Sequence, residues 1–94
     1  MTAPYSDPVS PYPGWIRQIY RLSRPITKDD VDAFAGGQEI YIRETSSGPE
    51  HIIHKYGLME IHCLIGEREI EIWFSPEKSA SVSDYLDALL ATRF

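Results

Sequence analysis

The three histidines and the single cysteine are the residues whose types could bind a metal ion or carry a covalent reaction. They are His51, His54, His62 and Cys63. A zinc site needs four convergent ligands, usually supplied as closely spaced pairs. His51 and His54 are three residues apart and His62 and Cys63 are adjacent, so in strands the members of each pair point to opposite faces. The spacing therefore predicts no metal site.

Cys63 could act as a nucleophile only if it were exposed and close to a histidine base. The alternation of the surrounding residues turns Cys63 toward the core, between Ile61 and Ile65, so we expect a buried and inert thiol. A lone cysteine also excludes an internal disulfide framework, which fits a reducing compartment.

The run from Leu58 to Phe74 predicts one antiparallel hairpin with two unlike faces. With a turn at Gly66-Glu67, one face pairs only apolar residues: Cys63 with Ile70, Ile61 with Ile72, and Met59 with Phe74. The other face pairs Leu64 with Glu69, His62 with Glu71, and Glu60 with Trp73. Because strand side chains alternate, a slip of one residue would put the glutamates in the core.

His62 opposite Glu71 is the kind of histidine–carboxylate pair that general base catalysis uses. The sequence places no serine or cysteine beside this pair, and cross-strand pairs of opposite charge are common on exposed sheet faces. We therefore predict no catalytic residues and no cofactor. A small enzyme or ligand binder that uses His62 and Glu71 is the alternative.

The second face of the hairpin has the composition of a docking surface, because a tryptophan ringed by carboxylates is typical of an interface anchor with a charged rim. The candidate partner-binding residues are Trp73, Glu60, Glu69, Glu71, Glu67, Leu58 and Leu64. An acidic array of this kind fits the basic surface of a partner protein. The alternative is an ordinary solvated sheet face, with Trp73 covered by the N-terminal segment.

The length and charge of the chain limit its class. Its 94 residues suffice for one small domain with a single core. Fourteen acidic and nine basic residues give a net charge of −5, which argues against direct binding of nucleic acid. No apolar run approaches the roughly 18–20 residues of a membrane-spanning helix, and no secretory signal is visible. These features predict a cytoplasmic protein without membrane contact.

Prolines, glycines and helix-capping residues delimit the predicted elements before the hairpin. Four of the seven prolines lie in residues 1–14 and predict a flexible N-terminal tail, ahead of a single domain over residues 15–94. Residues 15–22 fit a strand, with a helix as the alternative. Thr27 and Asp30 predict the start of a helix, and Gly36-Gly37 predicts its end.

Two further strands are predicted over residues 38–45 and from residue 51 onward, with Gly57 marking a bulge or bend before Leu58. A last helix starts at Ser75-Pro76 or at Ser81. The predicted fold is α+β, in the order β-α-β-β-β-α, with a mainly antiparallel four-stranded sheet and two helices on one face. The predicted core is Ile40, Ile42, Met59, Ile61, Cys63, Ile70, Ile72, Phe74, Val31, Phe34, Leu86 and Leu89.

Together these features predict a non-catalytic protein-binding module. The specific version is a small acidic regulator or inhibitor that covers a basic, nucleic-acid-binding surface of a partner protein. Small stand-alone proteins of phages and mobile elements often work this way, which is an analogy of size and charge. A further alternative is a structural subunit that forms a homodimer or larger homo-oligomer through a strand edge or a sheet face.

Overall fold

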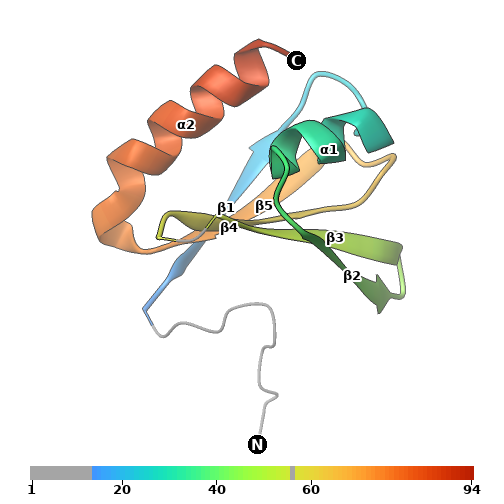
Figure 1. Cartoon of the computed structure of the whole chain (residues 1–94), viewed down its shortest axis with the longest axis horizontal. Helices are drawn as coiled ribbons and strands as arrows, with labels where there is room; N and C mark the ends of the chain where they lie inside the picture. Colours follow the sequence, from blue (N-terminus) through green and yellow to red (C-terminus); the bar gives the residue numbers. More distant parts are fainter. Residues whose placement is uncertain (1–13, 56) are drawn as a thin grey trace, which may run out of the picture.

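A computed structural model describes residues 14–55 and 57–94, which form five strands and two α-helices. The elements are β1 (Ile16–Arg21), α1 (Lys28–Ala35), β2 (Ile40–Thr45), β3 (Gly48–Lys55), β4 (Met59–Cys63), β5 (Glu69–Phe74), the 3-10 turn η1 (Pro76–Lys78) and α2 (Ser79–Ala91). Neighbouring strands are antiparallel and follow the order β1-β5-β4-β3-β2 (Figure 1). The predicted tail over residues 1–14 lies outside the described residues, apart from Gly14.

The sheet has five strands instead of the predicted four, so the order of elements is β-α-β-β-β-β-α. The difference arises at Gly57, which we expected to bend one long strand. Gly57 has a φ of 77°, and the N–H of Leu58 donates to the carbonyl of Lys55 at 2.9 Å across the turn. A positive φ suits glycine, so the chain reverses here and β3 and β4 become antiparallel neighbours.

β1 occupies one edge of the sheet beside β5, and its ladder runs from Ile16 opposite Phe74 to Arg21 opposite Glu69. This pairing confirms the strand interpretation of residues 15–22 over the helical one. It also places the two arginines of β1, Arg17 and Arg21, alongside the glutamates of β5, a long-range consequence that local sequence patterns do not reveal.

α1 begins and ends where the sequence predicts. Thr27 and Asp30 form a capping box, in which the Asp30 N–H donates to the Thr27 hydroxyl and the Thr27 N–H donates to the Asp30 carboxylate. Gly36 adopts a left-handed φ of 59° and donates its N–H to the carbonyl of Asp32. The start of the last helix at Ser75-Pro76 is also confirmed, because η1 leads directly into α2.

The Asp30 side chain also joins α1 to the C-terminal end of the chain. Its buried carboxylate accepts from Arg24 Nη1 at 2.7 Å and Nη2 at 2.9 Å, and from Arg93 Nε at 2.8 Å. The Arg24 guanidinium lies 4.3 Å above the ring of Phe94, which stacks on Phe34. Hydrogen bonds from Arg24, with further ones from Thr27 and Arg93, outweigh burial and hold the pKa of Asp30 well below its usual range.

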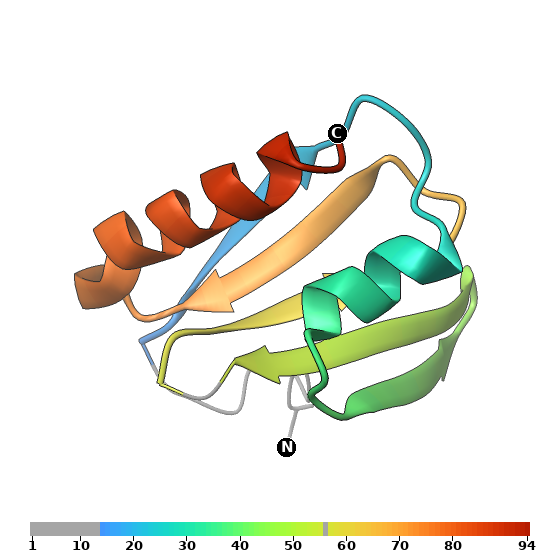
Figure 2. The same cartoon turned by 45° about the horizontal axis from the view of Figure 1, so that its top comes forward.

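One core lies between the sheet and both helices, which cover the same face of the sheet (Figure 2). The predicted hairpin register is confirmed over four pairs, and Ile61 and Ile72 face each other with exposed fractions of 0%. Ile42 is the wrong member of the predicted core, since it is 61% exposed. It lies on the edge strand β2, beyond α1, which packs against β3.

The other members of the predicted core are confirmed, and they differ in how far they are buried. Ile40 and Leu89 are partly buried against the core, and the other predicted members are buried. Five further apolar residues are buried beyond the predicted core: Leu22, Ile26, Ala35, Ile53 and Val82. Within the described residues, no helix combines the length and the apolar character that crossing a membrane requires.

Candidate functional site on the outer sheet face

The sheet face opposite the helices, called the outer face below, carries a histidine surrounded by charged side chains. The register places Glu60 beside Trp73 and His62 beside Glu71, as the sequence predicts. β3 contributes Glu50, Ile52 and His54 to the same face, because Ile52 pairs with His62 and His54 pairs with Glu60. The outer face therefore joins side chains from three neighbouring strands around His62.

Glu60 and His62 are buried, and this corrects the expectation of a solvated acidic face. Each is 2% exposed. β4 is the central strand, so side chains of β3 and β5 flank its outer residues on both sides. Glu60 therefore has almost no exposed surface to present to a partner.

Glu60 instead orients His62. His62 Nε2 lies 2.9 Å from Glu60 Oε1, a geometry in which the ring N–H donates to the carboxylate. The other carboxylate oxygen lies 3.3 Å from Nδ1 of His54. His62 Nδ1 has no hydrogen-bond partner in the described part of the chain and lies 3.6 Å from Oε1 of Glu50. Nε2 of His62 is thus hydrogen-bonded to Glu60. Nδ1 faces the Glu50 carboxylate but makes no hydrogen bond to it.

The outer face is mixed in charge rather than acidic. Arginines from the flanking strands pair with its glutamates: Arg17 with Glu71, Arg21 with Glu69 at 2.8 Å, and Arg43 with Glu50 at 2.7 Å. The indole N–H of Trp73 donates to Glu71 at 3.0 Å, so Trp73 helps to position a glutamate. Local sequence patterns do not reveal these arginines, because they reach the glutamates through the pairing of β1 with β5 and of β2 with β3.

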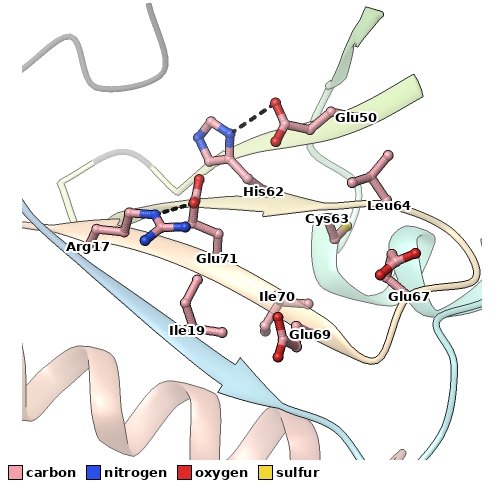
Figure 3. Close-up of a pocket in the computed structure, with 10 residues that line it drawn as sticks. All are labelled: Arg17, Ile19, Glu50, His62, Cys63, Leu64, Glu67, Glu69, Ile70 and Glu71. Carbon is pink, nitrogen blue, oxygen red and sulfur yellow. Dashed lines mark hydrogen bonds and ion pairs between the residues drawn. The ribbon is translucent and has the colours of Figure 1, made fainter. Parts of the chain in front are cut away.

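A hollow of about 160 Å³ opens on this face (Figure 3). Four of the seven predicted docking residues line it, namely Leu64, Glu67, Glu69 and Glu71. Trp73 is partly buried and is not part of the lining. Leu58 lies in the turn before β4 and packs against the core, because strand alternation does not extend into the turn. Leu58 is thus a second correction to the predicted surface.

Three potential metal ligands converge in the hollow. They are Glu50, His62 and Glu71, here called the His62 cluster, and one ligand atom of each lies within 4.8 Å of the others. The four residues considered from the sequence do not converge, since His51 lies opposite Cys63 on the inner face while His54 and His62 lie on the outer face. Glu50 was missed because only the pairing of β3 with β4 brings it to His62.

Cys63 is buried, as predicted, with an exposed fraction of 3%. Desolvation, together with the nearby negative charges of Glu50 and Asp30, raises the pKa of its thiol to about 12. The thiolate is the reactive form, so Cys63 is a poor nucleophile at neutral pH.

Comparisons with known proteins do not extend this description: no family model matches the chain, and no curated protein or solved structure gives a significant match. What the chain does must therefore be inferred from its own residues. The lining of the hollow combines carboxylates, arginine and imidazole with apolar carbon, and it contains no hydroxyl side chain. Such a set can bind a cationic group.

Proposed function

We propose that this chain is a non-catalytic protein-binding module, a small regulator or inhibitor that docks on a basic surface of a partner protein. The observation that carries the proposal is the rim of the hollow, where carboxylates lie next to exposed apolar carbon. Ile19 is 40% exposed, and the side chain of Glu69 is 46% exposed. Glu67 is exposed and has no ion-pair partner among residues 14–55 and 57–94.

The size of the hollow favours a side chain over a small-molecule substrate. Pockets for drug-sized ligands typically have volumes of about 300–1,000 Å³, whereas this hollow has about 160 Å³. A lysine or arginine from a partner would place its alkyl stem against Ile19 and Leu64 and its charged head near Glu67 and Glu69. Basic residues are concentrated on nucleic-acid-binding surfaces, which makes such a surface the proposed target.

The proposed docking residues therefore differ from the set expected from the sequence. Leu64, Glu67 and Glu69 stay in it, and Ile19 of β1 joins it. Glu69 and Glu71 are both paired with arginines of β1, but Glu71 contributes less to a partner because its side chain is only 21% exposed, against 46% for Glu69. Trp73 acts through Glu71 instead of anchoring the interface.

The proposal predicts that reversing the charge of the rim weakens partner binding. We expect Glu67→Lys combined with Glu69→Lys to lower the affinity for a captured partner by at least about tenfold, because two attractive rim charges become repulsive. The affinity of the original chain should also fall as salt is added. Affinity capture from lysate of the source organism identifies the partner, and calorimetry with that purified protein measures both effects.

The matched control is Glu77→Lys combined with Asp84→Lys, which changes the net charge equally at exposed positions on η1 and α2. The control should bind like the original chain. Equal losses of affinity in both double variants would show that the effect comes from net charge alone and not from the rim. An unchanged affinity in the rim variant would contradict the proposed surface.

A second copy of the chain is the alternative partner, and the edge strand β2 favours it. Ile42 is 61% exposed and Tyr41 is 43% exposed, and no strand among the described residues pairs with the outer edge of β2. Uncovered edges with apolar side chains are prone to pair with another chain. Sedimentation over a range of concentrations should then show a dimer that Ile42→Lys converts to a monomer. A chain that stays monomeric at every concentration would eliminate this alternative.

A further inference from the structure

We propose that the His62 cluster binds a divalent first-row transition-metal ion, with Zn²⁺ as the reference ion. The ligands would be Nδ1 of His62 and one carboxylate oxygen each from Glu50 and Glu71. They come from the neighbouring strands β4, β3 and β5 and point into the same hollow (Figure 3). Metal binding at this site needs no protein partner, so its test is independent of the test of the docking proposal.

The unpaired nitrogen of His62 is the observation that points to a ligand. The His62 side chain is 1% exposed, and its Nδ1 lacks a hydrogen-bond partner among the described residues. Because Nε2 donates to Glu60, the lone pair of Nδ1 faces Oε1 of Glu50 at 3.6 Å. Nδ1 is a buried acceptor without a donor, which is unfavourable, whereas Glu50 Oε1 is held in front of it by a hydrogen bond from Arg43 Nη2 at 2.7 Å. A metal ion at this point would give Nδ1 the partner that it lacks and could bind Glu50 through a remaining lone pair.

The groups around the cluster have the arrangement that supports metal ligands. Histidines that bind metals usually donate their second ring N–H to a carboxylate, as His62 does to Glu60. Carboxylate ligands are themselves hydrogen-bonded, and here Arg43 holds Glu50. Arg17 and Trp73 hold Glu71 in the same way. A carboxylate has about four lone-pair positions, so each glutamate can keep these bonds and still bind a metal.

The spacing of the ligand atoms suits a small tetrahedral ion. Zinc–nitrogen and zinc–oxygen bonds of about 2.0–2.2 Å put neighbouring ligand atoms about 3.3–3.6 Å apart. The 3.6 Å between His62 Nδ1 and Glu50 Oε1 already matches this separation, and Glu71 needs a small inward shift. The fourth position would open to the hollow and take water. One imidazole with two carboxylates favours transition metals over Ca²⁺ or Mg²⁺.

Calorimetric titration of the 94-residue chain with ZnCl₂ tests the proposal. We expect one Zn²⁺ per chain, and addition of Co²⁺ should produce visible absorption bands of a bound ion. His62→Gln should weaken zinc binding by at least about a hundredfold, and Glu60→Gln by about 10–100-fold, since Glu60 orients the ligand. MgCl₂ should give no comparable heat.

Two matched controls exclude adventitious binding to surface groups. His51→Gln removes a histidine from the inner face, and Glu69→Gln removes an ion-paired glutamate beside the cluster. Both should bind Zn²⁺ like the original chain. If a melting curve shows that His62→Gln is unfolded, Glu50→Gln combined with Glu71→Gln gives the same test. The absence of stoichiometric zinc binding, binding that survives loss of the ligands, or binding lost in the His51 variant would overturn the proposal.

Discussion

Replacing Ile61 or Ile72 with alanine should lower the free energy of unfolding by about 2–5 kcal/mol. Both side chains are 0% exposed and face each other on the paired strands β4 and β5. Truncation removes buried apolar surface and leaves a cavity beneath the helices, which the surrounding backbone can fill only in part. Urea unfolding followed by far-UV circular dichroism measures the loss.

Ile42→Ala is the matched control for this prediction. It makes the same substitution on the helix-facing side of the sheet, at a position that is 61% exposed. Its effect should lie within about 0.5 kcal/mol of zero. Equal losses at Ile42 and Ile61 would mean that β2 is covered and that the strand order is wrong.

Replacing Asp30 with asparagine should cost about 2–4 kcal/mol at neutral pH, because the buried carboxylate accepts charge-assisted hydrogen bonds that an amide cannot reproduce. Arg24 donates two of these bonds, Arg93 donates one, and the backbone of Thr27 donates another. The exposed Asp29, which lies in the same helical turn, is the control. Asp29→Asn should change stability by no more than about 0.5 kcal/mol.

Replacing Asp30 with asparagine should also remove part of the acid sensitivity of the fold. The pKa of Asp30 is lowered in the folded state, and an unfolded aspartate has a pKa of about 3.9. The unfolded state therefore binds the proton more readily, so the contribution of Asp30 is complete above about pH 4 and is lost as the pH falls toward the folded pKa. Melting curves between about pH 2 and pH 7 should show a shallower decline for Asp30→Asn. An equally steep decline would contradict the role assigned to this carboxylate.

The hairpin register was predictable because its two faces differ so strongly in polarity. Ile61 and Ile72 can face the core only if His62 and Glu71 lie on the other side, so alternation fixed the pairing. The number of strands was not predictable in the same way. A glycine within a strand-like run suits a bulge as well as a turn, and the hydrogen bond from Leu58 to Lys55 and the pairing of β3 with β4 distinguish the two.

The set of side chains around His62 depends on which strands lie beside β4, and this is a long-range property. Local patterning assigns Glu60 and His62 to a polar face, and polar faces of antiparallel sheets are usually solvated. The pairing of β3 with β4 brings Glu50 beside His62, and the pairing of β1 with β5 brings Arg17 to Glu71. A signal for Glu50 does exist in the sequence, since a turn at Gly57 pairs Ile52 with His62 and puts Glu50 diagonally across from it.

The arrangement around His62 is tested most directly by a long-range ¹H–¹⁵N correlation spectrum of the histidine rings at about pH 8, before and after one equivalent of Zn²⁺. Before addition, we expect the proton of His62 on Nε2, held by Glu60, and a bare Nδ1. After addition, the Nδ1 resonance of His62 should move to that of a metal-bound nitrogen while the His51 ring stays unchanged. A proton on Nδ1 in the metal-free chain, or zinc that shifts His51 and leaves His62 in place, would contradict this arrangement.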